Sequence, residues 1–243
     1  MRLGLIAERF IDKDLDFNFA QMTHWLRKSK GEAYDLLCFG ESFAQGFDGL
    51  SWNHEEDLKI ALHKDDQRIC RLAQTAREFQ TGIAFGYIER EGQHLYSSYL
   101  VLSDQGEQLC NFRRLSPGWK EPIANSDTYL EGKTYDTFQL KDKTFGIAIC
   151  GDLWHDDLLE NFQKQKSDLL LWPLYINYKA KEWEEQEKAA YAERAGMLKR
   201  PVLMINSLSA PPNQAFGGAY LFDEGKIKAE LAMGESGILT IEI

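Results

Sequence analysis

Residues 144–152 read TFGIAICGD, an apolar run that ends in a small polar turn. The run has the length of a buried strand, and the charged segment that begins at Asp156 predicts a helix soon after it. The same succession recurs along the chain, because apolar runs of strand length alternate with charged segments of helical length. This alternation is typical of layered α/β proteins, so we expect an α/β fold.

The same pattern places the other elements. Strands are expected at Arg2–Ala7, Tyr34–Glu41, Gly82–Ile88, Leu95–Leu102, Gln108–Phe112, Thr144–Ile149, Leu169–Tyr175, Val202–Ser207, Gly218–Phe222 and Gly237–Glu242. Helices are expected at Asp14–Lys28, Glu55–Gln80, from Asp156 onward and at Lys181–Lys199. No linker, low-complexity tract or internal repeat interrupts them. We therefore expect one domain that spans residues 1–243.

The charge of the chain excludes several classes of partner. Its 243 residues include 28 Lys and Arg against 38 Asp and Glu, which gives a formal net charge of -10. A nucleic-acid binder needs a basic surface, and anionic membranes repel an acidic protein. The N-terminal apolar run is too short for a signal peptide, and no stretch reaches the ~20 apolar residues of a membrane span. We expect a cytoplasmic protein that binds neither nucleic acid nor membrane.

The four cysteines are far apart in the sequence. Cys38, Cys70, Cys110 and Cys150 form no CxxC pair and no zinc-finger spacing. A chain of this length can bury a core without disulfides, so we expect neither a disulfide nor a metal site.

Cys150 has a setting that distinguishes it from the other three cysteines. Taken alone, a free cysteine is more often a small buried hydrophobe than a nucleophile. Cys150, however, follows an apolar strand and precedes Gly151 at a turn toward a helix. Backbone N–H groups at such a turn favour a thiolate and could hold an oxyanion. Cys150 is therefore a candidate nucleophile.

A cysteine nucleophile needs a base, and the sequence favours a carboxylate. His155 is the one histidine near Cys150, and we expect it to face solvent at the start of a helix. Glu41 ends a strand that contains no other charge after Asp35, and carboxylates are rarely buried without a partner or a task. A desolvated carboxylate is a stronger base than an exposed one. A role for Glu41 in helix capping or in a salt bridge remains open.

Several motifs together resemble those of one family. Residues 145–153 resemble the nucleophile motif of the nitrilase, or carbon–nitrogen hydrolase, superfamily, in which an apolar strand leads to Ile-Cys-x-Asp. Glu41 with the following Gly46-Phe47 is similar to the strand-end glutamate of that family. Residues 112–114 stand where the family has Tyr-Arg-Lys, and Glu121 falls where many members have a second glutamate. The resemblance covers essentially the whole chain, and the order of these motifs is more specific than any one of them.

The resemblance implies a fold, an assembly and a reaction. The fold would be a four-layer α-β-β-α sandwich, and pairing of two copies through helices would give a homodimer. The reaction would be hydrolysis of a non-peptide C–N bond in a small amide, without a metal or an organic cofactor. Glu41 would take the proton of Cys150, whose thiolate attacks the carbonyl carbon. A cation and the backbone N–H of Gly151 would hold the oxyanion, and Glu41 or Glu121 would activate the water that cleaves the thioester.

The sequence departs from the family at the catalytic cation. The family lysine is replaced by Arg114, and Lys120 is a second candidate from a different backbone position. Arginine can stabilise an oxyanion but does not readily give up a proton. Considered alone, Lys120 and Glu121 would be solvated loop charges. The departure motivates an alternative function, that of a catalytically impaired relative that binds a small molecule or a protein.

Aromatic residues near these motifs are candidate walls of a substrate pocket. Phe47, Trp119, Trp172 and Tyr175 would favour a compact or partly apolar acyl group, and ordinary packing in the core or a dimer remains the alternative. The sequence leaves open whether the substrate is an amide, a ureido acid or a nitrile. No GxGxxG or GxxxxGK[ST] run follows a strand, which argues against a nucleotide-binding protein.

Overall fold

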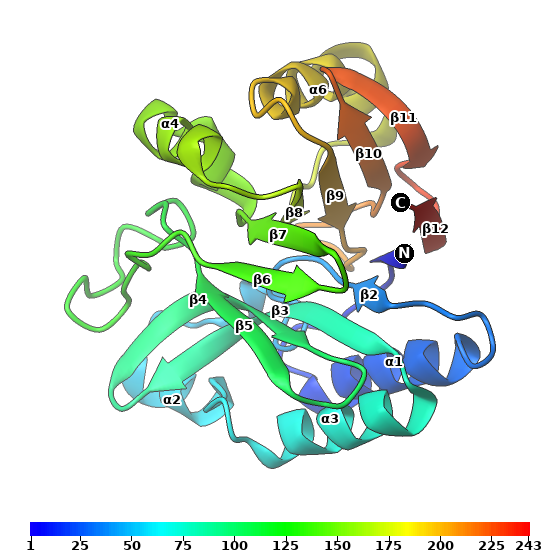
Figure 1. Cartoon of the computed structure of the whole chain (residues 1–243). Coiled ribbons are helices and arrows are strands. Elements are labelled where there is room, and N and C mark those ends of the chain that lie inside the picture. The colour runs from blue at the N-terminus through cyan, green and yellow to red at the C-terminus, as the bar shows by residue number, and fades with distance from the viewer.

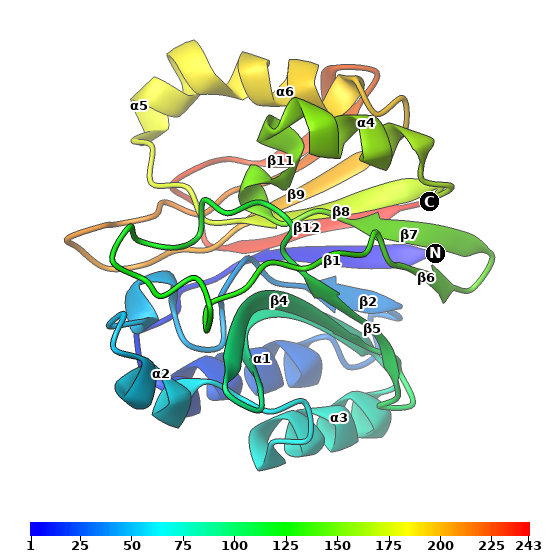
Figure 2. The ribbon, with the colours of Figure 1, turned by 90° about the vertical axis from the view of Figure 1, so that its left-hand side faces the viewer.

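The protein is a sandwich of two six-stranded sheets with helices on both outer faces (Figures 1 and 2). The computed structural model describes residues 1–243 in full. The strand order is β12-β1-β2-β3-β4-β5 in the first sheet and β11-β10-β9-β8-β7-β6 in the second. Figure 2 shows the layers edge-on, with α1 and α3 below the first sheet and α4 and α6 above the second. The expected four-layer α-β-β-α fold is therefore confirmed.

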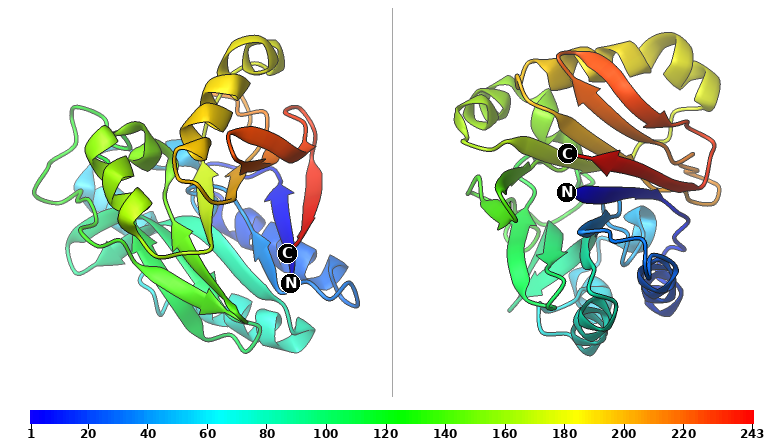
Figure 3. Two further views of the ribbon diagram at one scale, coloured as in Figure 1. Left: turned by 45° about the horizontal axis from the view of Figure 1, so that its top comes forward. Right: turned by 45° about the vertical axis from the view of Figure 1, so that its right-hand side comes forward.

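The first sheet combines parallel and antiparallel strands. Its strands are β1 (Arg2–Ala7), β2 (Leu36–Cys38), β3 (Gly82–Glu91), β4 (His94–Leu102), β5 (Gln108–Arg113) and β12 (Gly237–Glu242), and its helices are α1 (Leu15–Lys28), α2 (His54–Ile60) and α3 (Gln67–Phe79). Strands β1, β2 and β3 are parallel, whereas β4, β5 and β12 pair antiparallel to their neighbours. Since β12 pairs with β1, the two chain ends lie side by side (Figure 3).

The second sheet has a parallel centre and antiparallel edges. Its strands are β6 (Thr137–Leu140), β7 (Lys143–Ile147), β8 (Leu169–Leu174), β9 (Val202–Asn206), β10 (Ala219–Asp223) and β11 (Lys226–Leu231). Its helical segments are α4 (Asp156–Lys164), α5 (Ala180–Glu182), a π-helical turn at Trp183–Glu187 and α6 (Lys188–Gly196). Strands β7, β8 and β9 are parallel. No helix is long and apolar enough to cross a membrane.

Alternation along the strands divides the buried residues into two main cores. In β2, Leu36 and Cys38 face the second sheet, whereas Leu37 and the following Phe39 pack under α1 and α3. Successive side chains of a strand point to opposite faces, so a strand buried on both faces has an unbroken apolar sequence. This is why the apolar runs predicted the central strands.

Several predicted elements differ from the structure at their boundaries. The helix expected at Glu55–Gln80 is two helices, because Leu62 leaves the helical path and exchanges backbone hydrogen bonds with Ile88 and Arg90 at the end of β3. The expected strand Tyr34–Glu41 is shortened to β2, and the expected helix Lys181–Lys199 consists of α5, the π-helical turn and α6.

Two strands were not predicted, and both are edges of the second sheet. Strand β6 has four residues, and β11 alternates charged and apolar residues in the sequence KIKAEL. Each strand has one neighbour and a face open to solvent. Neither therefore shows the apolar run by which buried strands are recognised.

Candidate active site

Glu41 and Arg114 form a buried ion pair between the sheets. Glu41 follows β2 and Arg114 follows β5, and their side chains are 1% and 3% exposed. Arg114 Nη1 donates to Glu41 Oε1 at 2.8 Å, and the Ser97 hydroxyl lies 3.4 Å from the same oxygen. Glu41 Oε2 has no hydrogen-bond partner. One carboxylate oxygen is therefore held in place, and the other is unpaired.

A glycine in β3 allows Glu41 to approach this closely. Gly86 donates its backbone N–H to the Gly40 carbonyl at 3.1 Å. A Cβ atom at Gly86 would lie 2.7 Å from Glu41 Cα, which is closer than real side chains permit. Gly86 thus positions the glutamate, although the sequence pattern marked it only as a strand residue.

Cys150 begins a tight turn at the end of the second sheet. It is the first residue of the 3₁₀ turn Cys150–Trp154 and has a left-handed backbone with φ of 46°. The Sγ atom lies 3.9 Å from the Tyr175 carbonyl oxygen, to which the thiol can donate. The Trp172 indole donates to the Cys150 carbonyl oxygen at 2.9 Å. The hydrogen bond from Trp172 therefore fixes the backbone of the turn, while Cys150 itself remains partly exposed.

The surroundings of Cys150 favour its protonated thiol over the thiolate. Burial, followed by the negative charge of Glu41, raises the pKa of Cys150 to about 12, although Arg114 acts in the opposite direction. The prediction that the turn would favour a thiolate is therefore wrong for the resting state. Loss of hydration around the sulfur outweighs the local N–H groups.

Asp152 connects the turn at Cys150 to the loop after β5. Its side chain is completely buried, and burial raises its pKa. One carboxylate oxygen accepts from the N–H groups of Leu115 and Ser116 at 3.0 and 2.7 Å, and the other accepts from Ile149 at 2.9 Å. The aspartate of the Ile-Cys-x-Asp motif therefore joins the two segments that carry Arg114 and Cys150.

The guanidinium of Arg114 is held on three sides. Besides the contact with Glu41, its Nε donates to the Ser116 hydroxyl at 2.8 Å. A Cβ atom at Gly151 would lie 2.6 Å from Nη2, so only glycine leaves room for this group. Burial opposes the charge, but the neighbouring carboxylates of Glu41 and Asp152 raise the pKa of Arg114 above its usual range, so it stays protonated.

Lys120 and Glu121 make no hydrogen bond or ion pair with Glu41, Arg114 or Cys150. Lys120 Nζ contacts Glu131 Oε1 at 2.5 Å and donates to the Tyr129 carbonyl at 2.9 Å. Glu121 is exposed and forms no ion pair. Contacts and charge interactions link Glu41, Arg114 and Cys150, whereas no hydrogen bond or ion pair links Lys120 or Glu121 to these three residues. His155 is exposed, as expected.

The aromatic candidates occupy different environments. Phe47 stacks on Tyr175 with ring centroids 4.2 Å apart. Trp119 packs near Trp52 and Tyr129, with its ring centroid 6.3 Å from that of Trp52. Trp172 is fully buried, so it supports the Cys150 turn and presents no surface to a pocket. This differs from the wall position expected for Trp172.

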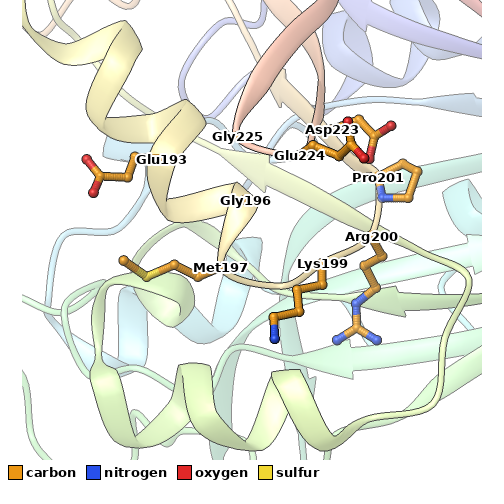
Figure 4. A pocket seen from close by; sticks show the side chains of 9 residues that line it. All are labelled: Glu193, Gly196, Met197, Lys199, Arg200, Pro201, Asp223, Glu224 and Gly225. Carbon is orange, nitrogen blue, oxygen red and sulfur yellow. The ribbon is translucent and has the colours of Figure 1, made fainter.

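A small cavity lies beside these residues, and we call it the side cavity. It has a volume of about 130 Å³ and is lined by Phe47, Asp48, Leu50, Trp52, Gly118, Trp119, Lys120 and Glu121. A larger hollow, of about 750 Å³, lies elsewhere, between the end of α6 and the β10–β11 turn (Figure 4). None of Glu41, Arg114 and Cys150 lines that hollow. No group of three or more His, Cys, Asp or Glu side chains is arranged to hold a metal ion.

Known proteins resemble the chain in fold and in sequence. The amidase of the nitrilase superfamily from Nesterenkonia AN1, solved as a Cys→Ala variant, superposes with a TM-score of 0.81 at 14% identity, over 100% of this chain and 90% of that one. An arylacetone-specific nitrilase from Alcaligenes faecalis is 31% identical over 112 residues, which are 42% of this chain and 32% of that protein. An N-carbamoylputrescine amidase from Arabidopsis thaliana is 24% identical over 67% of this chain and 55% of that protein.

These likenesses differ in extent. The chain spans less than two thirds of the length of the two curated relatives. The family profile described as "Carbon-nitrogen hydrolase", in contrast, matches residues 11–243. The match therefore includes every strand except β1, and the segments that carry Glu41, Arg114 and Cys150. The chain belongs to the carbon–nitrogen hydrolase family.

Proposed function

We propose that the protein hydrolyses the C–N bond of a small amide-type substrate through a thioester on Cys150. The observation that carries this proposal is the convergence of a buried carboxylate, a cation and a thiol at the facing ends of the two sheets. One carboxylate oxygen of Glu41 is unpaired, and Arg114 donates a hydrogen bond to the other. The charges of Glu41 and Arg114 both act on the pKa of the Cys150 thiol. This set suits nucleophilic catalysis with a paired base.

Acylation begins with proton transfer inside the site. Glu41 Oε2 takes the thiol proton as Cys150 Sγ attacks the carbonyl carbon of the bound amide. The raised pKa of Cys150 keeps the thiol neutral until the substrate is in place. The tetrahedral oxyanion is stabilised by Arg114 Nη2 and by the backbone N–H of Gly151. Glu41 then passes its proton to the departing nitrogen, and ammonia leaves.

Deacylation uses the same groups in reverse roles. Water replaces ammonia, Glu41 accepts one of its protons, and the resulting hydroxide attacks the thioester carbonyl. Collapse of the second tetrahedral intermediate releases the carboxylic acid, and the proton on Glu41 returns to Cys150 Sγ. One water is consumed for each amide bond broken.

Because Arg114 does not exchange its proton, we assign all proton transfers to Glu41. The guanidinium keeps its proton and contributes charge and hydrogen bonds only. Lys120 does not share the task, because its ammonium is paired with Glu131.

Ammonia release over a panel of small primary amides, ureido acids and nitriles tests the proposal. We expect release by the wild-type protein on at least one amide, no release above background by Cys150→Ala, and unchanged release by Cys70→Ala, which removes an exposed cysteine outside the site. Release by Cys150→Ala at the wild-type rate would contradict the proposal. Absence of release by the wild type, together with saturable binding of panel compounds, would favour the binding module motivated by Arg114.

A further inference from the structure

We propose that the side cavity selects substrates whose acyl chain ends in a positively charged group, such as an ammonium. The inference rests on the proposed hydrolysis at Cys150 and specifies its substrate class. It is carried by the position of the cavity, the character of its walls and the balance of charge around it.

The side cavity adjoins the reacting groups on two sides. On one side it is lined by Gly118, where a Cβ atom would lie 3.4 Å from Arg114 Nη2. On the other side it is lined by Phe47, which stacks on Tyr175, the residue whose carbonyl oxygen lies 3.9 Å from Cys150 Sγ. None of Glu41, Arg114 and Cys150 lines the cavity itself, so we infer from these two neighbouring contacts that a chain attached to a carbonyl at Cys150 extends into it.

Aromatic rings form much of the cavity wall. Phe47, Trp52 and Trp119 all line it, and Trp52 is half-buried with a left-handed backbone at φ 62°. Rings of this kind attract a cation placed over their faces, and tryptophan does so most strongly. The cavity volume of about 130 Å³ equals roughly four water molecules, which suits a few methylenes and an amine.

The charges around the cavity leave an excess of carboxylates. Asp48 and Glu121 line the cavity and form no ion pair, and Asp48 accepts only from the Asn213 amide, at 2.8 Å. The one cation in the wall, Lys120, is neutralised by Glu131 at 2.5 Å. Arg114 is neutralised in the same way by Glu41. An incoming cation would therefore meet two carboxylates that are unpaired and solvent-exposed, together with three aromatic residues.

One buried donor in the cavity wall is unpaired. Trp119 is 6% exposed, yet its indole N–H has no hydrogen-bond partner. An ammonium has no acceptor and cannot satisfy this donor, so the indole N–H is not among the observations that carry the cationic preference. The same donor, together with Lys120, could instead serve a carboxylate-ended substrate, and the experiment below includes that outcome.

Three amides of similar length separate these outcomes. The probes are δ-aminovaleramide, which is cationic, hexanamide, which is neutral, and glutaric acid monoamide, which is anionic, with shorter and longer homologues of each. We expect kcat/KM for ammonia release to be about tenfold higher for the cationic amide than for the neutral one, which is the size of one desolvated cation–π contact. The anionic amide should be the poorest substrate, and added salt should reduce the differences.

Variants identify the groups responsible. Glu121→Gln, Asp48→Asn and Trp52→Leu should each lower the ratio of kcat/KM between the cationic and neutral probes several-fold. The matched control is Glu160→Gln, which neutralises an exposed carboxylate on α4 outside the cavity and should leave the ratio unchanged. Titration of the three probes into Cys150→Ala by calorimetry measures the same preference without turnover.

Failure of this inference is distinguishable from failure of the proposed hydrolysis. Turnover of hexanamide equal to that of the cationic probe overturns the cationic preference but leaves the hydrolysis in place. Preference for the anionic probe assigns the cavity to carboxylate recognition and likewise overturns the inference. Absence of ammonia release from every amide contradicts the hydrolysis, and the calorimetric order of the probes then decides the cavity preference by itself.

Discussion

At the scale of single residues, Arg114 is the feature that most distinguishes the site. A lysine in its place would offer one ammonium, whereas the guanidinium contacts Glu41 and Ser116 with two nitrogens and lies against Gly151 with the third. The site is therefore built around the planar shape of arginine. This is physically different from a lysine site that has lost its lysine.

Replacement of Arg114 by lysine should reduce activity. The ammonium would still reach Glu41, but the Ser116 hydroxyl would lose its partner and the oxyanion would lose one donor. We expect kcat to fall about 100-fold, the usual effect of removing one such donor. Steady-state ammonia release measures it. A gain of activity in Arg114→Lys, or an equal loss of kcat in Lys120→Ala, would contradict this role.

The Glu41 carboxylate should make Cys150 less acidic. Burial and then Glu41 raise the pKa of Cys150 to about 12, while Arg114 lowers it. In Glu41→Gln the negative charge is gone and Arg114 remains, so the pKa of Cys150 should fall below about 12. Because the thiolate fraction below the pKa increases tenfold for each unit by which the pKa falls, alkylation should accelerate at pH 8 while turnover stops.

The pH dependence of iodoacetamide alkylation, with the modified cysteine identified by mass spectrometry, checks this expectation. In the wild type the alkylation rate at Cys150 should rise with pH without a plateau below about pH 11. The inflection in Glu41→Gln should lie at lower pH. The same or a higher inflection in the variant would show that the Glu41 charge does not control the thiol.

The sequence indicates the residues proposed to react better than it indicates the residues that position them. Glu41 and Cys150 are recognisable because each follows an apolar strand. The choice between Arg114 and Lys120 depends on which side chain crosses to Glu41, and this is a property of the packed loops. Gly86 was overlooked because its task, the close approach of two strands, involves partners that are distant in sequence.

At the scale of elements, the loop after β5 and the turn after β7 act as one unit through Asp152. Three backbone N–H groups converge on its carboxylate. An amide in this position would present two donors where only acceptors are required. The fixed relation of Arg114 to Cys150 therefore depends on this one side chain.

Asp152→Asn should weaken both stability and catalysis. We expect the free energy of unfolding to fall by about 1–3 kcal/mol, because at least one buried N–H loses its acceptor. We also expect kcat to fall more than KM rises, since the oxyanion donors lose their alignment. Urea unfolding and steady-state kinetics measure these effects. Glu160→Gln, on the surface of α4, should change stability by less than about 0.5 kcal/mol. Equal stability of Asp152→Asn and wild type would contradict the account.

Elements were predictable from the sequence where burial is complete. The central strands have continuous apolar runs because both faces are covered; α1 begins and ends close to the predicted residues, and α4 begins at the predicted Asp156. The edge strands β6 and β11 were missed because one side of each faces water. The break between α2 and α3 was missed because it is imposed by the pairing of Leu62 with β3.

At the scale of the whole molecule, the two sheets share one core. Leu36 and Tyr99 of the first sheet belong to the same buried cluster as Phe145 and Leu171 of the second. Neither sheet can bury its inner face alone, so we propose that residues 1–243 fold as a single unit.

Cooperative unfolding tests this proposal. Trp25 lies under the first sheet and Trp172 lies in the second, so tryptophan fluorescence reports on both halves. The fluorescence and far-UV circular dichroism transitions in urea should coincide. Two transitions separated in denaturant concentration would show that the sheets unfold independently.

The central claim is that Cys150 carries the acyl group of the substrate during turnover. Intact-mass spectrometry of the protein quenched in acid during hydrolysis of an amide substrate tests this most directly. We predict a mass increase equal to the acyl group, localised by peptide mapping to Cys150, slow to decay when water attack is impaired and absent in Cys150→Ala. An unmodified Cys150 during sustained ammonia release, or an adduct on a different residue, would contradict the account.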